Sequence, residues 1–363
     1  MPLLSLPPEL LIHILSSIPS RNTLIALATT CRRLYAVFLD NRTTLIYAAL
    51  RAELGASLPE ALAFTAILAL DVDAKDYLVR LGEVLETYKQ DLWGDGGEGE
   101  RMVGPAPQRM EEEFVKEMSK AHRDVSCVAG VYAECAVLLL ECEVKPGCED
   151  AAQAERVAAP LSEVERARIL KAHYRLALQK NLERWTYYWL RCDPGAYRFL
   201  HFGLVGQWEA WEVQQVLSAT QFVDSVLTPR LADDADLGDA IEECRDWLPI
   251  PLTWDGLATI REFVEQLREL DEDAWQEVVR RSSSFQNGLD KDPWRVVRRS
   301  LRLDRPWHLR YDESCRHAFE LRSASVAMWD SPRVEAMKTS STLQHCKTGW
   351  ARRAPVRWGP RYY

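Results

Sequence analysis

Apolar residues near the N-terminus follow a helical period and cover an unusually wide arc. At 100° per residue, Leu10, Ile14, Ile18, Leu11 and Leu15 fall within about 140° of the helix surface. Ser16, Glu9, His13 and Ser17 leave only a narrow polar strip on the other side. A surface helix usually buries a stripe of roughly 100°. The extra width predicts that this helix meets a partner besides the chain's own core.

Two further helices are expected directly downstream. Residues 19–22 end the first helix and offer capping side chains for a second over residues 23–35, and a third runs through Leu45, Ile46 and Leu50 after a break at residues 40–41. A unit of roughly 40 residues seldom folds stably without a metal, a disulfide or a partner. Its sequence has no residues at the spacing of a metal site or a disulfide, so we expect docking on another protein to stabilise it.

The same residues resemble a known family motif. Residues 5–11, residues 14–19, Leu24, Leu27 and residues 31–35 are similar in order and spacing to an F-box. The resemblance implies docking on the Skp-type adaptor of a cullin-based ubiquitin ligase, while the rest of the chain recruits a protein for ubiquitination. One departure is visible, because Leu45 or Ile46 stands where many F-boxes have an aromatic residue.

Carried over position by position, the resemblance implies a set of partner contacts, some of which are expected to pack internally instead. The set is Pro7, Leu10, Leu11, Ile14, Leu15, Ile18, Leu24, Leu27, Cys31, Leu34 and Tyr35. Two other interpretations of the stretch are a helical hairpin buried against a larger domain and a secretory signal. A signal peptide needs a basic start, whereas the first positive charge here is Arg21.

The chain as a whole is predicted to be all-α, with a three-helix F-box over residues 1–50 and a larger, irregular helical domain over residues 51–305. Within that domain we expect a mobile loop at about 93–109, rich in glycine, proline and acid, and a break at about 145–160. Ser162 and Glu165 have the spacing of a capping box and mark the start of a helix. Residues 306–363 form a basic segment rich in tryptophan and arginine, predicted to be partly irregular.

The helical domain is the expected recruitment domain. Residues 163–175 and 208–212 resemble the helical region of F-box proteins common in filamentous fungi. Between residues 185 and 211 lies a dense cluster of aromatic residues, most of which we expect in a core because large rings at helical spacing usually pack there. The predicted substrate-facing residues are Tyr187, Tyr188, Tyr197 and His201.

Charge, apolar runs and cysteines restrict the partners. Residues 1–290 carry a net charge of −18 and residues 291–363 one of +9; the acidic body disfavours nucleic-acid binding, which depends on Lys and Arg. Because the longest apolar runs are far shorter than the roughly 20 residues that span a bilayer, no membrane partner is expected. The nine cysteines contain no C-x-x-C pair and are typical of reduced thiols in the cytoplasm or nucleus.

No catalytic motif is found, and no cofactor or metal is expected. His308, Cys315, His317, His345 and Cys346 are the only ligand-like grouping, and their spacing is unlike that of common zinc sites. The sequence therefore predicts a non-catalytic receptor that binds a Skp-type adaptor, through it a cullin, and an unknown protein substrate. The alternatives are an adaptor-bound scaffold without a ligase role and a helical enzyme with a structural N-terminal hairpin. The substrate itself is not predicted.

Overall fold

The protein is predominantly helical in the part of the chain that the structure describes. The computed structural model describes residues 6–71, 76–93, 111–141, 151–190, 208, 210–223, 261–262, 265, 328–330 and 332–333. These residues contain no strand, which confirms the all-α prediction. The chain divides into two compact units, the first made of Met1–Cys127, His173–Trp208 and Leu252–Leu257, and the second of Val128–Ala172, Glu209–Pro251 and Ala258–Tyr363.

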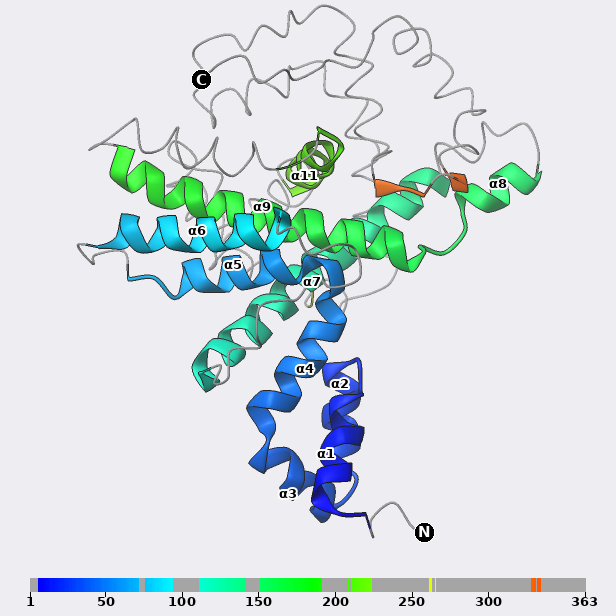
Figure 1. Ribbon diagram of the computed structural model, residues 1–363. Helices are drawn as coiled ribbons and strands as arrows, with labels where there is room; N and C mark the ends of the chain where they lie inside the picture. The colour runs from blue at the N-terminus through cyan, green and yellow to red at the C-terminus, as the bar shows by residue number, and fades with distance from the viewer. Residues whose placement is uncertain are drawn as a thin grey trace, which may run out of the picture. The chain divides into compact units, whose positions relative to one another are not determined.

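The first unit begins with four short helices, which are α1 (Pro8–Ser16), α2 (Arg21–Ala28), α3 (Arg32–Asp40) and α4 (Arg42–Leu54) (Figure 1). Helices α1 and α2 each pack against both α3 and α4. Their shared core consists of Leu15, Leu24, Ala28, Phe38, Leu45 and Ala49. The core therefore draws one or two side chains from every helix, so no helix of this group buries its apolar face alone.

The predicted continuous helix over residues 23–35 is wrong, because the chain breaks between α2 and α3. The Thr29 hydroxyl donates to the Ile25 carbonyl at 3.0 Å, and the Thr30 hydroxyl donates to the Leu27 carbonyl at 2.7 Å. Cys31 then caps α3, since its Sγ accepts the Leu34 amide at 3.5 Å. Side chains that bond to nearby backbone in this way compete with helix continuation.

A short turn leads from α4 into the body of the first unit. The turn, Gly55–Ser57, is followed by α5 (Leu58–Leu68) and α6 (Tyr77–Trp93), which pack against each other (Figure 1). Gly55 has φ = +49°, in the left-handed region that favours glycine. Farther along the chain, α7 (Glu112–Leu139) and α9 (Glu163–Leu190) each contribute residues to both units.

A buried ion pair lies in the interior of the first unit. Arg175 Nε donates to Glu60 Oε1 at 2.9 Å, and the two side chains are 2% and 0% exposed. The Tyr88 hydroxyl also donates to Glu60 Oε1 at 3.3 Å, and Trp208 Nε1 donates to the Tyr88 oxygen at 3.1 Å. Burial and the charge of Glu60 raise the pKa of Tyr88, which stays protonated. These contacts link α5, α6 and α9 and fix their positions along one another.

The second unit contains α8 (Ala151–Val157), the first part of α9 and α11 (Ala210–Phe222). At the start of α9 the predicted capping box is confirmed, since the Glu165 amide donates to Ser162 Oγ at 3.1 Å and the Ser162 amide to Glu165 Oε2 at 2.9 Å. The rings of Tyr132 and Phe222 meet edge to face, with centroids 5.2 Å apart.

The described residues test only some of the domain and loop boundaries that the sequence predicts. Helix α8 lies inside the stretch of 145–160 that was predicted as a break, while the predicted loop of 93–109 falls almost wholly outside the described residues. The domain borders at 50 and 305 stay predictions. Among the described residues, no helix is long and apolar enough to cross a membrane.

The buried ion pair generates a stability prediction. Arg175→Leu leaves the Glu60 carboxylate buried without its cation, so the free energy of unfolding should fall by about 3–5 kcal/mol. Glu60→Gln combined with Arg175→Leu removes the orphaned charge and should cost less than Arg175→Leu alone. Urea denaturation followed by circular dichroism measures both.

The matched control for this prediction is Arg80→Leu, which removes an arginine from the exposed side of α6 and should change the stability by no more than about 0.5 kcal/mol. If Arg175→Leu lowered the free energy of unfolding no more than Arg80→Leu does, the buried ion pair would not stabilise the first unit.

Candidate docking site

The N-terminal helices begin at a proline pair that fixes the start of α1. The Pro7 carbonyl accepts the amides of Leu10 and Leu11 at 3.1 and 3.2 Å, and Pro8 occupies the first turn, where its missing N–H is not needed. Glu9 adds a negative charge in that turn, favourable at the positive end of the helix dipole. This start sets which residues of α1 face inward.

Four of the eleven predicted partner contacts lie in the interior of these helices. Leu11, Leu15 and Leu24 are 0% exposed, and Leu34 is 3% exposed. They hold α1, α2 and α3 together, so a partner reaches them only if the helices come apart. The sequence-based expectation that some of the set packs internally applies to these residues.

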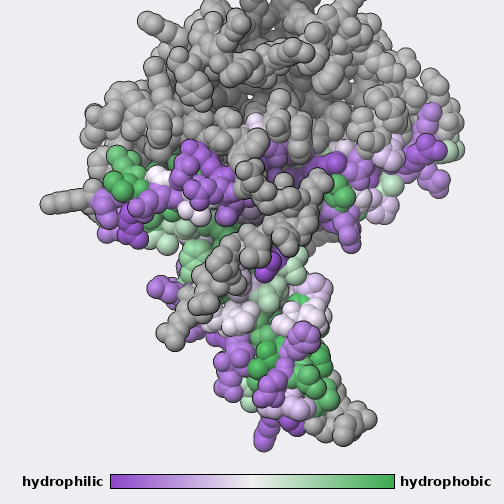
Figure 2. All heavy atoms as spheres, viewed as in Figure 1, coloured by the Kyte–Doolittle hydropathy of each residue, from purple (hydrophilic) through white to green (hydrophobic). Residues whose placement is uncertain are grey.

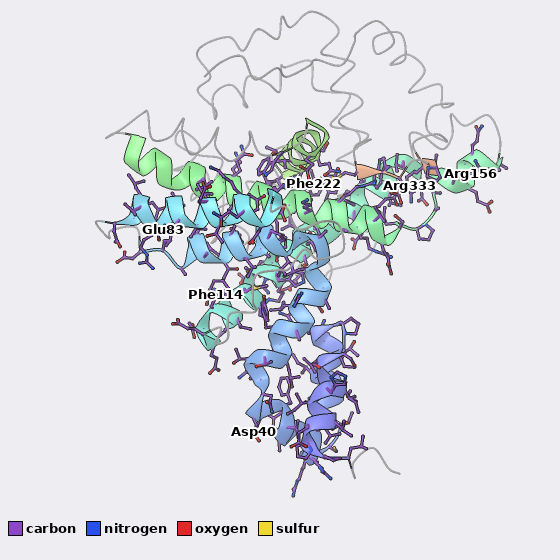
Figure 3. The ribbon with its side chains drawn as sticks, viewed as in Figure 1. Asp40, Glu83, Phe114, Arg156, Phe222 and Arg333 are labelled. Carbon is purple, nitrogen blue, oxygen red and sulfur yellow. The ribbon has the colours of Figure 1, made fainter. Side chains whose placement is uncertain are left out.

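The other seven predicted contacts are at least partly accessible. Pro7, Leu10 and Tyr35 are exposed, whereas Ile14, Ile18, Leu27 and Cys31 are half-buried. Cys31 also caps α3. Figure 3 shows that side chains of α1 to α4 point both between the helices and outward, with Asp40 at the end of α3.

Two exposed apolar residues were missed by the sequence analysis. Ile25 on α2 is 41% exposed and Leu39 on α3 is 48% exposed, comparable to Leu10 at 48% and Tyr35 at 45%. Leu39 follows Tyr35 by one helical turn, a spacing that could have revealed it. We call Leu10, Ile25, Tyr35 and Leu39 the exposed apolar set. In Figure 2, hydrophobic side chains gather on the visible face of the N-terminal helices.

Polar contacts join the N-terminal helices to the rest of the first unit. Glu53 Oε1 accepts the Arg21 amide at 2.7 Å, so this carboxylate caps the start of α2 from α4. Arg21 Nη1 donates to the Ser119 carbonyl at 2.9 Å, and His122 Nε2 lies 3.3 Å from Glu53 Oε2. Helix α7 therefore contacts both α2 and α4 through Ser119 and His122.

Tyr174 completes this junction from α9. Its hydroxyl lies 3.0 Å from His122 Nδ1. Burial, with the charge of Glu53, raises the pKa of Tyr174, so the hydroxyl keeps its proton. Nε2 faces the Glu53 carboxylate, which only accepts, so this ring nitrogen donates to Glu53. Burial alone would raise the pKa of Glu53, but the bonds from His122 and the Arg21 amide outweigh it and hold this pKa below 4.5.

The remaining predicted site residues are not placed. Tyr187 and Tyr188 belong to α9, but their side chains lie outside the described residues, as do Tyr197 and His201 altogether. The histidines and cysteines between 308 and 346 also lie outside that part of the chain. Within the part described, no group of three or more His, Cys, Asp or Glu side chains could hold a metal ion.

Comparison with known proteins agrees with the geometry of the N-terminal helices. A bundle of short helices that leaves apolar side chains exposed is typical of a protein-docking module. The family model described as F-box-like matches residues 3–44, which contain α1, α2, α3 and the start of α4. The chain therefore contains an F-box-like domain at residues 3–44. No similar curated protein and no similar solved structure was found.

The junction predicts a pH-dependent contribution from Glu53. A carboxylate whose pKa is lowered by folding stabilises the fold above its ordinary pKa, and this contribution is lost as the pH falls through the lowered value. Glu53→Gln should therefore be less stable than the wild type at about pH 6, and the difference should shrink as the pH drops below 4.5. Urea denaturation across this pH range measures it.

A suitable control is Glu113→Gln, which removes a carboxylate that is 70% exposed on α7 and should give a small difference at every pH. A stability difference for Glu53→Gln that stayed constant down to about pH 3 would contradict the role of the Glu53 charge.

Proposed function

We propose that this protein is a non-catalytic substrate receptor. Its N-terminal helices dock on a Skp-type adaptor and through it on a cullin, and the remainder of the chain recruits a protein for ubiquitination. The F-box-like match supports the adaptor step, since F-box domains typically bind such adaptors. The single observation that carries the proposal is the exposed apolar set on those same helices.

The exposed apolar set favours a protein partner on energetic grounds. Fully burying a leucine or similar side chain contributes about 1.5–3 kcal/mol, so covering a residue that is half exposed contributes about 1 kcal/mol. Tyr35 adds an aromatic ring, a residue type enriched at binding hot spots. Four such residues on three short helices would together contribute about 4 kcal/mol towards the cost of association, and a partner reaches them without opening the core.

We further propose that the catalytic step of ubiquitin transfer belongs to the ligase's other subunits. A receptor of this kind contributes proximity and orientation, which greatly raise the effective concentration of the recruited protein. Recruitment by residues 51–305, including Tyr187, Tyr188, Tyr197 and His201, and the resemblance to fungal F-box proteins belong to the same proposal. The cytoplasm or nucleus is the compartment it requires.

Two other functions remain as alternatives. A scaffold would bind the adaptor without a cullin and would support no ubiquitination. A helical enzyme would keep its activity when the N-terminal docking surface is altered. Neither is favoured by an observation as direct as the family match together with the exposed apolar set.

The docking proposal is tested by substituting exposed residues only. Leu10→Asp places a carboxylate where the adaptor would cover an apolar side chain, so adaptor affinity should fall at least about tenfold. Leu39→Asp should act in the same direction. The full chain is coexpressed with a Skp-type adaptor, and affinity is measured by titration calorimetry on purified protein whose helicity equals that of the wild type.

The matched control is Leu78→Asp, because Leu78 is a leucine on α6 that is also exposed, by 42%. It should bind the adaptor like the wild type. Leu11→Asp makes an unsuitable test, since Leu11 is fully buried and its substitution would damage the helices themselves. Equal binding by the Leu10→Asp, Leu39→Asp and Leu78→Asp variants would place the adaptor contact elsewhere, and no binding by the folded wild type would overturn the proposal.

A further inference from the structure

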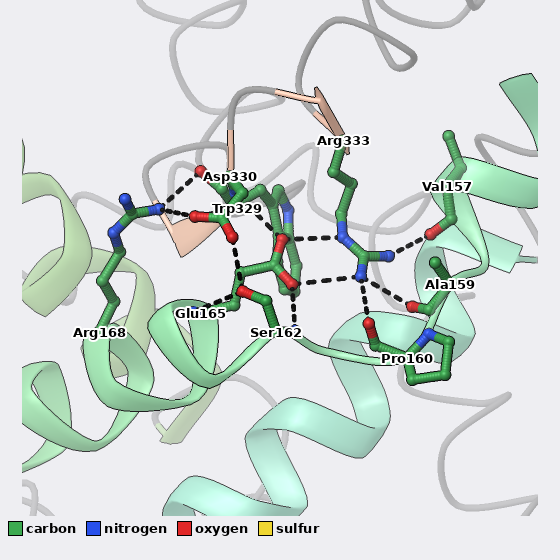
Figure 4. A network of polar contacts seen from close by, with 9 residues as sticks. All are labelled: Val157, Ala159, Pro160, Ser162, Glu165, Arg168, Trp329, Asp330 and Arg333. Atoms are coloured by element: carbon green, nitrogen blue, oxygen red, sulfur yellow. Dashed lines mark hydrogen bonds and ion pairs between the residues drawn. The ribbon is translucent and has the colours of Figure 1, made fainter.

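In the second unit, a short segment near the C-terminus inserts an arginine beside the start of α9. Arg333 is 5% exposed and forms a two-point ion pair with Glu165, with Nε to Oε1 at 2.9 Å and Nη2 to Oε2 at 3.2 Å (Figure 4). Nη2 also donates to the carbonyls of Ala159 and Pro160 at 2.7 and 3.1 Å, and Nη1 donates to the carbonyl of Val157. We call Glu165 and these three carbonyls the arginine socket.

The socket is shaped for a guanidinium group. All of its contacting atoms are acceptors, and two of them belong to a carboxylate that is itself 2% exposed. A planar fork of N–H donors satisfies a carboxylate and several carbonyls at once, whereas a lysine ammonium presents three donors at one point. An empty socket would leave a buried carboxylate and carbonyls without these bonds, which costs free energy. The arginine socket is therefore stabilised by a guanidinium ligand.

A second pocket of contacts recognises the aspartate three residues earlier. Arg168 Nη1 donates to Asp330 Oδ1 at 3.0 Å, and the Ser162 hydroxyl donates to Asp330 Oδ2 at 2.5 Å. The Asp330 amide donates to Glu165 Oε1 at 3.0 Å. The side chains of Arg168 and Asp330 are 32% and 28% exposed, so this end of the contact reaches the surface.

The segment also carries an aromatic anchor. Trp329 is 4% exposed, and the guanidinium of Arg333 lies 5.4 Å from the centre of its ring. Its carbonyl accepts from Arg168 Nη1 at 2.9 Å. Within five positions, the Trp329 carbonyl and the side chains of Asp330 and Arg333 thus each bond to a partner on the α8–α9 segment, more than 160 residues away in the chain.

We propose that the start of α9 is a peptide-binding site, and that residues 328–333 are its internal ligand. The ligand class is a short peptide with an aromatic residue, an aspartate directly after it and an arginine three residues beyond the aspartate. A partner protein that carries this pattern competes with the chain's own segment. The inference concerns the second unit and does not depend on adaptor docking.

Competition follows from the nature of the contact. An internal ligand occupies the socket at the high effective concentration set by its tether, so the wild-type protein binds an external peptide weakly. Removing the internal arginine empties the arginine socket and weakens this competition, and it leaves Glu165, Ser162 and Arg168 in place.

The test uses the full chain and a fluorescent synthetic peptide with the sequence of residues 326–335. Fluorescence anisotropy should show binding to the Arg333→Ala variant at least about tenfold tighter than to the wild type. Replacing the arginine of the peptide by lysine should weaken this binding at least about tenfold, because lysine lacks the planar fork. The peptide substitution leaves the protein unchanged, so its effect is independent of folding.

A second measurement separates a ligand site from a purely structural contact. A saturating amount of the same peptide, labelled with heavy isotopes, is added to the wild type, and deuterium uptake of residues 328–333 is followed by mass spectrometry. Faster uptake is expected as the internal segment is displaced. Unchanged uptake at saturation, no binding to the Arg333→Ala variant with wild-type helicity, or equal binding of the arginine and lysine peptides would each overturn the proposal.

Discussion

The four N-terminal helices contain more apolar side chains than their shared core accommodates. Their core takes one or two residues from each helix, among them Leu15, Leu24, Phe38 and Leu45. The helices are 8 to 13 residues long, too short to be stable alone. Each therefore depends on its neighbours for burial, and the residues left over become the exposed apolar set. The buried core and the exposed apolar set therefore occupy adjacent stripes of the same helices.

Polar contacts decide how these helices meet the rest of the first unit. Glu53 on α4 caps the start of α2 and faces His122 on α7, and His122 in turn forms a hydrogen bond with Tyr174 on α9. Apolar packing tolerates small shifts between helices. A chain of hydrogen bonds that ends at a carboxylate tolerates them less, because each bond depends on distance and angle. Together with the buried pair of Glu60 and Arg175, the junction restricts the first unit to one arrangement of its helices.

Local sequence patterns predicted much of the fold because helices are local structures. The capping box at Ser162 and Glu165 was identified from spacing alone and is formed as expected. The break at residues 29–31 was missed because the apolar period continues across it, from Leu27 through Cys31 to Leu34, while threonine hydroxyls end α2. Periodicity also identified the apolar face of α1. It did not locate the edge of that face, since Leu10 is 48% exposed and its neighbour Leu11 is 0% exposed.

Glu165 shows why the rest of the structure is not visible in local sequence. Its capping role needs a partner three residues away, and that role alone explains a glutamate at this position. The same carboxylate binds Arg333 from 168 residues away. Burial alone would raise the pKa of Glu165, but the bonds from Arg333 and from the Asp330 and Ser162 amides hold this pKa below its ordinary value. A residue with a sufficient local explanation gives no signal of a second, distant partner, so only the folded chain reveals that Glu165 also pairs with Arg333.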